Sequence, residues 1–416
     1  MNIATAARIW LTRSFKPFVF KNEYDNKILY EDTENLGLYI HIPFCRSICS
    51  FCPYCKTVYN KDLANRYTDA LIKEIELTGK SISGKKEVTS LYFGGGSPAL
   101  LADRLNEIIA VVNDYFIIKE GIGLELHPDD VTVELLQKIK SAGVSKISIG
   151  IQSFRREQLS VLGRKEPDYR TLFSALKEVT FETVSFDLIF AIPGQTAESL
   201  KQDISYAFEN GANHIAIYPF IDFSFSHSNV MPMTEKEKRN LLDSITDYCT
   251  SCGYVRTSIW TFAKEPAKKY SSMTRDNFLG FGCSATTLLK DQFKINTFSI
   301  KDYIVRVEQN QLPTSLTLRF TLRQRMIYYL FWTAYTTRVD PKAFERFFGV
   351  SLYSKYGFEL LLCQVLGFTK KKNGIYQMTA KGAYYYHYFE QFYTLAYIDK
   401  MWGIMRKEAF PDKITL

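Results

Sequence analysis

Short apolar segments alternate with longer amphipathic ones from about Gly37 to Phe220, and this alternation restricts the possible folds more than any other feature of the chain. Near-continuous apolar strands separated by helices are typical of a parallel sheet covered by helices. The helices are expected near residues 61–80, 102–116, 131–142, 169–179 and 197–209. The strands are expected at Gly37–Pro43, Thr89–Phe93, Ile122–Leu126, Lys146–Ile151, Val184–Ile189 and His214–Pro219. Six such units predict an α/β fold, a partial (β/α)6 barrel of the TIM type rather than the full eight units.

The pattern changes on either side of this region. We expect residues 1–35 to form an N-terminal extension, 36–230 the barrel, and 231–314 an extension of the barrel close to the substrate. Beyond about residue 315, three helix-like segments precede a hairpin-like one, so residues 315–416 are predicted to form a C-terminal, mostly helical domain resembling a winged helix. These segments are Thr321–Thr337, Asp340–Phe348, Leu352–Leu366 and Gly374–Thr379.

Composition and charge bear on the partners. The net charge of +8 is spread along the chain, which favours anionic ligands without requiring nucleic acid. The run Lys370–Lys372 lacks an accompanying arginine-rich face, so no nucleic-acid binding is expected. The richest apolar stretch, Met326–Tyr335, is too short to span a membrane and is interpreted as a buried helix. Arg8, Arg13 and Lys16 interrupt the N-terminal apolar residues, so the N-terminus lacks the apolar segment and the cleavage site of a signal peptide. A cytoplasmic location is therefore expected.

Four of the eight cysteines, Cys45, Cys49, Cys52 and Cys55, fall within eleven residues. Eight cysteines are too few for a disulfide scaffold in a chain of 416 residues, so the group indicates a metal or cluster site. Three thiolates on one short loop can bind three irons of a [4Fe–4S] cluster and leave the fourth iron open. Cys55 could close that fourth position, and zinc held by four cysteines is an alternative. Zinc sites normally use CxxC pairs separated by a longer arm, which favours the cluster.

Unusual residues also collect where the expected strands end. The cysteines follow the first strand, Gly94–Ser97 follows the second, and Glu125 lies at the end of the third. Gln152, Asp187 and Tyr218 occupy or follow the fourth, fifth and sixth strands. Because barrels of this kind carry their chemistry at the carboxyl ends of the strands, we expect these residues to share one site.

The motifs together resemble the radical S-adenosylmethionine (SAM) enzymes, whose signature is CxxxCxΦC with an aromatic residue, here Phe51, before the third cysteine. Residues 39–45, 93–98, 148–154 and 186–196 narrow the resemblance to one branch. That branch contains the oxygen-independent coproporphyrinogen III oxidases, haem chaperones, anaerobic haem-degrading enzymes and class C radical SAM methyltransferases. The resemblance covers roughly residues 36–290, with a weaker match beyond.

The resemblance implies a [4Fe–4S] cluster held by Cys45, Cys49 and Cys52, and SAM bound at its open iron. It also implies that the branch commonly binds two SAM molecules, with Gly96 and Ser97 contacting the second. No further catalytic residue is assigned. The residues that the resemblance places at the cofactors are Tyr39, Phe51, Gly95, Gly96, Ser97, Glu125, Gln152, Arg164 and Asp187.

The reaction is less closely defined than the branch. Thr257, Trp260, Ser272, Thr274 and Arg275 offer aromatic and hydrogen-bonding groups near the barrel mouth, which suits a flat aromatic or tetrapyrrole-like substrate. Methyl or alkyl transfer is favoured, because Tyr270–Ala285 resembles a segment of the class C methyltransferases. The alternatives are oxidative decarboxylation of coproporphyrinogen III, anaerobic haem degradation, and a haem chaperone without turnover. Reduced flavodoxin or ferredoxin is the electron donor that the resemblance implies.

Overall fold

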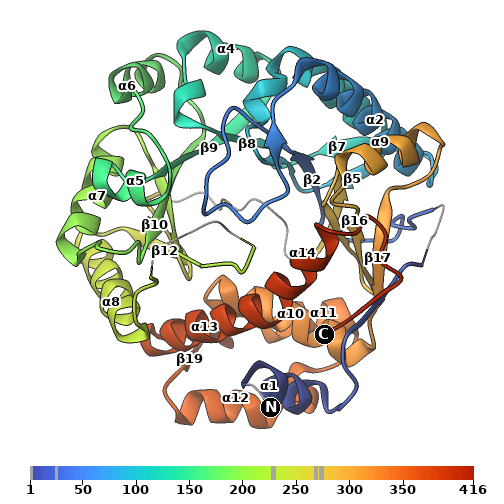
Figure 1. Ribbon diagram of the computed structural model, residues 1–416. Coiled ribbons are helices and arrows are strands. Elements are labelled where there is room, and N and C mark those ends of the chain that lie inside the picture. Colours follow the sequence, from blue (N-terminus) through green and yellow to red (C-terminus); the bar gives the residue numbers. More distant parts are fainter. Residues whose placement is uncertain (1–2, 24–26, 226–230, 267–269, 271–275) are drawn as a thin grey trace.

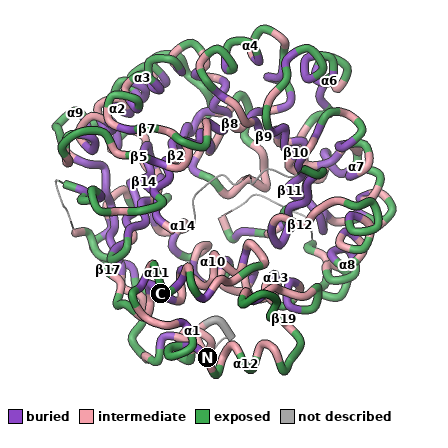
Figure 2. The backbone as a smooth tube through the Cα atoms, turned by 180° about the vertical axis from the view of Figure 1, so that it is seen from behind, coloured by how far each residue is buried: buried purple, intermediate pink, exposed green. Residues whose placement is uncertain are grey.

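The computed structural model describes residues 3–23, 27–225, 231–266, 270 and 276–416 (Figure 1). In this part of the chain, fourteen strands form one mixed sheet that curves round the centre of the molecule. Helices cover its outer side (Figure 1). Figure 2 shows that the strands are mostly buried, whereas the helices outside them carry both exposed and buried residues.

Six neighbouring strands of this sheet are parallel, which confirms the predicted partial barrel. Their buried side chains are mainly Ile, Leu, Val and Phe, as expected for strands covered on both faces. In spatial order they are β2 (Leu36–Ile42), β6 (Leu91–Gly95), β8 (Ile122–Leu126), β9 (Val144–Gln152), β10 (Thr183–Phe190) and β11 (His214–Pro219).

The main helices between these strands begin and end within three residues of the predicted bounds. Side chains of Asn60, Thr132, Asp168 and Thr196 cap four of them by accepting a backbone hydrogen bond in the first turn. A short helix, α5 (Arg156–Val161), was not predicted, because six residues carry too little periodicity. The main helices are α2 (Lys61–Gly79), α3 (Leu105–Tyr115), α4 (Val133–Ser141), α6 (Tyr169–Glu178) and α7 (Ala197–Glu209).

Strands from distant parts of the sequence extend the sheet at both ends. β14 (Asn277–Phe281) runs parallel to β2, a pairing that the sequence did not predict. The chain's two terminal strands, β1 (Val19–Lys21) and β21 (Lys413–Thr415), pair with each other. The other added strands are β12 (Val255–Ser258), β13 (Thr261–Ala263), β15 (Thr286–Leu288), β16 (Gln292–Asn296) and β17 (Thr314–Arg319).

Two further helices and several short elements complete the barrel region. Two helices, α8 (Glu235–Ser251) and α9 (Ile300–Glu308), pack outside the sheet (Figure 1). A two-residue ladder joins β3 (Phe44–Cys45) to β4 (Thr57–Val58) and so closes the loop that carries the cysteines. The remaining elements are β5 (Lys86–Val88), β7 (Phe116–Ile118), η1 (Pro98–Arg104) and η2 (Pro128–Asp130).

The C-terminal region is mostly helical, as predicted. Its three-stranded sheet consists of β18 (Arg338–Val339), β20 (Ile375–Met378) and β19 (Thr369–Lys372). Helices α10 and α13 lie between α8 and β17, across the side that the parallel strands leave open (Figure 1). The helical segments are α1 (Ile3–Thr12) at the N-terminus and α10 (Leu322–Tyr335), α11 (Pro341–Phe348), α12 (Leu352–Val365), α13 (Ala380–Tyr393), η3 (Thr394–Ile398) and α14 (Asp399–Met405).

The apolar helix α10 contacts α11 on one side and lines a central cavity on another. Met326 and Tyr329 pack against Phe344 and Phe348 of α11, while Phe331, Trp332 and other residues of α10 line a central cavity. Two apolar faces explain why its hydrophobic residues show no single stripe. Among the described residues, no helix combines the length and apolar character that a membrane crossing requires.

Candidate active site

A cavity of about 1350 Å³ lies inside the ring of strands. Its lining follows a period of two along the strands, because alternate side chains of a strand point to the same face. On three neighbouring strands the alternating lining residues are Ser148, Gly150 and Gln152 on β9, Asp187 and Ile189 on β10, and His214, Ala216 and Tyr218 on β11. Pro219, the last residue of β11, lines the cavity as well.

Three cysteines of the cluster loop, Cys45, Cys49 and Cys52, line this cavity and are partly buried. None of them forms a disulfide. Burial and then the neighbouring thiols of Cys52 and Cys49 raise the pKa of Cys45 to about 12. The Lys56 ammonium donates hydrogen bonds to the carbonyls of Cys49 and Cys52 and so holds the loop. Three neighbouring thiols that face an open cavity fit a cluster with one free iron.

Cys55 lies apart from this cavity. It is buried, and its Sγ lies 3.9 Å from Cys283 Sγ and 3.2 Å from the carbonyl oxygen of Phe298. The ring of the buried His41 hydrogen-bonds the Cys55 carbonyl through Nε2 at 2.9 Å. Cys55 is therefore surrounded by protein, and the lining of the cavity does not include it.

The glycines at the end of β6 and just after it pack directly against the cluster loop. The backbone N–H of Gly96 donates to Ile42 O, and that of Ser97 donates to Phe44 O, each over 2.7 Å. A Cβ on Gly96 would lie 2.4 Å from Phe44 O and 2.9 Å from Cys45 Sγ. Only glycine allows this approach, so the backbone borders the cavity without a side chain entering it.

Two partly buried carboxyl groups, those of Glu125 and Asp187, line the same cavity. Glu125 accepts a hydrogen bond of 3.0 Å from the Gly95 N–H, and Asp187 accepts one of 2.8 Å from Ser148 Oγ. Burial and then the charge of Glu125 raise the pKa of Asp187 to about 7, and burial raises the pKa of Glu125. Two like charges in a poorly solvated place favour a cationic ligand between them. The sulfonium and ammonium groups of SAM have this charge.

The other predicted cofactor residues lie in different surroundings. Phe51, Gln152 and Arg164 line the cavity; Gln152 has a left-handed φ of +70°, and Arg164 Nη1 donates to Gly150 O over 2.5 Å. Tyr39 does not belong to the lining, and its hydroxyl hydrogen-bonds His41 Nδ1 at 3.2 Å.

Ser97 also lines the cavity, but its hydroxyl already has a partner. Ser97 Oγ donates to Asp130 Oδ2 over 2.6 Å, and the other oxygen of Asp130 accepts from Arg46 Nε over 2.7 Å. Asp130 therefore connects the glycine loop to the residue that follows the first cysteine.

Sequence reasoning missed several lining residues. The hydroxyl of Tyr92 lies 3.1 Å from that of Tyr270. His214 Nδ1 hydrogen-bonds Ser185 Oγ at 2.9 Å, and burial lowers its pKa to about 4. A signal for His214 existed in the sequence, because it precedes Ala216 by two positions and Tyr218 by four on one strand and therefore shares their face.

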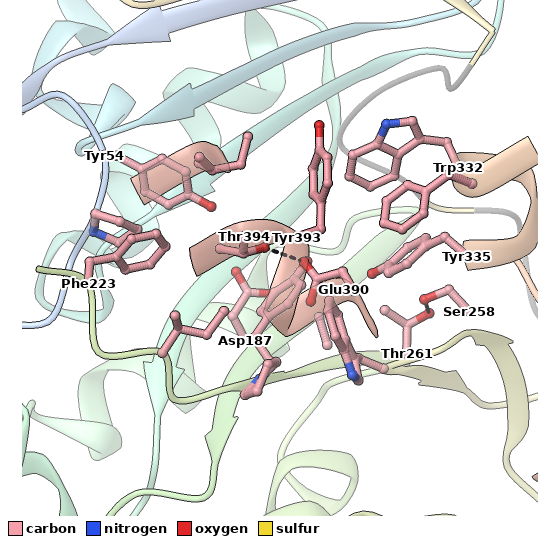
Figure 3. A pocket seen from close by; sticks show the side chains of 18 of the residues that line it. Tyr54, Asp187, Phe223, Ser258, Thr261, Trp332, Tyr335, Glu390, Tyr393 and Thr394 are labelled. Carbon is pink, nitrogen blue, oxygen red and sulfur yellow. Dashed lines mark hydrogen bonds between the residues drawn. The ribbon is translucent and has the colours of Figure 1, made fainter. Parts of the chain in front are cut away.

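Aromatic side chains from the helices of the C-terminal region line one side of the cavity, and we call them the aromatic wall. Trp332 and Tyr335 on α10 and Tyr393 on α13 gather there (Figure 3). Glu390 lies among these rings and accepts a hydrogen bond of 3.0 Å from Thr394 Oγ1 (Figure 3). Burial raises the pKa of Glu390 to about 7.

The predicted substrate pocket is only partly within the described residues. Thr257 and Trp260 line the cavity, and the Trp260 ring packs against Tyr335 with ring centroids 5.5 Å apart. Ser272, Thr274 and Arg275, predicted to contribute to the same pocket, lie outside the described residues. Flat aromatic surfaces of this kind suit a flat conjugated ligand.

Residues 39–207 match the model of the Radical SAM superfamily. The heme chaperone HemW of Bacillus subtilis is 27% identical over 333 residues, which cover 76% of this chain and 87% of HemW. The oxygen-independent coproporphyrinogen III oxidase of Salmonella typhimurium is 24% identical over 384 residues, covering 83% of this chain and 81% of that protein.

One solved structure shares the whole architecture. The coproporphyrinogen III oxidase HemN of Escherichia coli matches with a TM-score of 0.76 and 20% identity, over 92% of this chain and 98% of that chain. At this identity the likeness concerns the fold. The chain thus contains a Radical SAM domain within a HemN-like fold, and its homologues are HemW haem chaperones and oxygen-independent coproporphyrinogen III oxidases.

Proposed function

We propose that this protein is a radical SAM enzyme that oxidises a tetrapyrrole. A Radical SAM domain implies a [4Fe–4S] cluster and SAM, and Cys45, Cys49 and Cys52 would hold the cluster. The observation that carries the proposal is that these thiols, two partly buried carboxyl groups and an aromatic wall line one cavity of about 1350 Å³. This volume exceeds that of a usual small-ligand pocket and has room for a cofactor beside a large flat substrate.

When bound, the cluster and SAM supply a 5′-deoxyadenosyl radical, which abstracts a hydrogen atom. The chain's own residues would bind SAM and orient it. Glu125 and Asp187 would offer their carboxylates to the positive groups of SAM, and the side-chain-free backbone at Gly95 would let the methionine part approach. Phe51, Gln152 and Arg164 line the same part of the protein's cavity and would complete the site.

A second SAM molecule would contact Gly96 and Ser97, as the resemblance implies. Ser97 would then have to share or exchange its hydrogen bond with Asp130. The electron donor we propose is reduced flavodoxin or ferredoxin, because the proposed reaction needs a low-potential reductant for the cluster.

The reaction we favour is oxidative decarboxylation of coproporphyrinogen III, in place of the methyl transfer that the sequence favoured. The relatives described above are oxidases and haem chaperones, and their names offer no support for methyl transfer. Binding of haem without turnover is the second candidate, since the HemW relative matches over 87% of its own length.

An anaerobic assay of the reconstituted protein with reductant, SAM and coproporphyrinogen III distinguishes these functions. The proposal predicts 5′-deoxyadenosine together with carbon dioxide and a decarboxylated porphyrinogen. Formation of S-adenosylhomocysteine with a methylated product would instead support methyl transfer as the reaction. Stoichiometric binding of haem with neither product would identify a chaperone and overturn the enzymatic proposal.

A further inference from the structure

Helix α12 presents an apolar stripe to solvent, on the outside of the molecule and away from the cavity. Phe358, Leu361, Leu362 and Val365 are 60%, 59%, 42% and 75% exposed. Their spacing of three, four and seven residues places them on one side of the helix. Other residues of the same helix, Leu352 and Tyr356, are buried in the protein core. Helix α12 is therefore apolar on two sides, one of which is buried while the other is largely exposed.

Helix α1 extends this stripe. The ring of Trp10, 49% exposed, lies 6.2 Å from the ring of Phe358. Both views place α1 beside α12 at the edge of the molecule (Figures 1 and 2). We call the surface formed by Trp10, Phe358, Leu361, Leu362 and Val365 the α12 face. Contiguous apolar surfaces of this kind mark interaction sites.

Lysines are frequent in the part of the chain that carries most of the α12 face. Residues 352–382 contain five lysines and one acidic residue, Glu359. Glu359 pairs with Arg13 at 2.5 Å, so its charge is balanced. Lys355 on α12 is exposed, as is the run Lys370–Lys372 on β19, which follows α12 in the chain.

We propose that the α12 face binds the surface of an anionic lipid bilayer. A convex apolar stripe with an exposed tryptophan and flanking lysines has the features of a helix that lies in the membrane interface. The lysines would contact acidic head groups, to which basic clusters are attracted. A second copy of the chain fits less well, because it would bring two lysine-rich segments together.

Sedimentation of the full-length protein with lipid vesicles tests this inference. We expect binding to vesicles that contain phosphatidylglycerol, weaker binding to phosphatidylcholine alone, and a loss of binding as salt increases. The double variant Leu361→Glu and Val365→Glu should reduce vesicle binding by at least about tenfold. The variant Lys370→Gln and Lys372→Gln should weaken binding and its dependence on salt.

Val305→Glu is the matched control, since Val305 is a 40% exposed apolar residue on α9, remote from α12 (Figure 1). It should bind vesicles as the unchanged protein does, and circular dichroism would establish that each variant is folded. Absence of binding to phosphatidylglycerol vesicles at low salt would overturn the inference. So would equal binding by the Leu361 and Val365 double variant, or a dimer in solution that this variant dissociates without any vesicle binding.

Discussion

At the residue scale, the four clustered cysteines divide into two groups. Cys45, Cys49 and Cys52 border the cavity, whereas Cys55 is buried against Cys283 and the Phe298 carbonyl. Cys52 and Cys55 are only three positions apart in the chain, yet Cys52 faces the cavity and Cys55 does not.

We predict that Cys45→Ala, Cys49→Ala or Cys52→Ala abolishes the visible absorbance of a reconstituted [4Fe–4S] cluster, because each variant removes one of three ligands. Cys55→Ala should retain that absorbance. Iron and sulfide content, measured with the spectrum, checks the result. Cys252→Ala provides a control at an exposed cysteine. Loss of the cluster in the Cys55 variant would contradict the three-ligand assignment.

Asp187 gives a prediction on stability and pH. Its pKa in the folded protein is about 7, against 3.8 for an unperturbed carboxyl, so the folded state holds the proton more tightly than the unfolded chain. The contribution of this carboxyl to stability is present at low pH and is lost as the pH rises from about 4 to about 7. Asp187→Asn should therefore increase the free energy of unfolding near pH 7.5, by at most about 4 kcal/mol.

Urea unfolding of the SAM-free protein at several pH values measures this effect. The gain should shrink as the pH falls towards 5, and Asp114→Asn on α3, where the side chain is exposed, should show no such trend. SAM affinity should rise with pH through about 7 in the unchanged protein and become nearly independent of pH in the Asp187 variant. A gain in stability that does not vary with pH would be inconsistent with an ionisation effect.

At the scale of elements, the cluster loop is held between neighbouring strand ends. The β3–β4 ladder closes the loop from one side, and the backbone of Gly96 and Ser97 bonds to the chain just before it. The end of β6 therefore positions the cysteines as well as the edge of the cofactor site.

Gly96→Ala should disturb this arrangement, because its Cβ would meet Phe44 O at 2.4 Å and Cys45 Sγ at 2.9 Å. We expect a loss of about 1–3 kcal/mol in the free energy of unfolding, as for other overpacked positions, together with reduced iron content after reconstitution. Gly357→Ala is the control, since a Cβ there has no described atom within 4 Å. Normal iron content in the Gly96 variant would show that the close approach is not needed for the cluster.

At the scale of the whole molecule, the C-terminal region completes the site that the barrel begins. The Arg406 guanidinium, just after α14, donates a hydrogen bond to Pro53 O on the cluster loop and lies 4.5 Å from the Phe225 ring centre. On α14 itself, the Trp402 ring lies 6.1 Å from that of Tyr54. The two ends of the chain also share an edge of the sheet through β1 and β21.

We predict that Arg406→Ala makes the cluster more labile without preventing folding. Loss of a hydrogen bond worth about 1 kcal/mol should speed bleaching of the cluster in air by about fivefold. The decay of visible absorbance measures the rate, and thermal unfolding reports the stability of the protein. Lys407→Ala, at an exposed neighbouring position, should bleach at the unchanged rate. Equal rates in the two variants would show that α14 does not protect the loop.

Local patterns predicted the barrel well. The predicted bounds of Ile122–Leu126 and His214–Pro219 coincide with β8 and β11, and the helix predicted over 197–209 coincides with α7. Residue alternation and helix capping act between positions a few residues apart, so they can be read from the sequence. The pairing of β14 with β2 could not be predicted in this way, because it joins segments that are distant along the chain.

The same division applies to the site. The sequence alone predicted the three cysteines on one loop, the glycines at the end of β6 and the carboxyl groups on β8 and β10, because these follow from short spacings and strand ends. The folded structure was needed to show that Cys55 lies away from the cavity, that Tyr92 and His214 border it, and that α10 and α13 supply its aromatic wall. Which side chains share a cavity depends on how distant segments pack together, and local spacing carries no information about that packing.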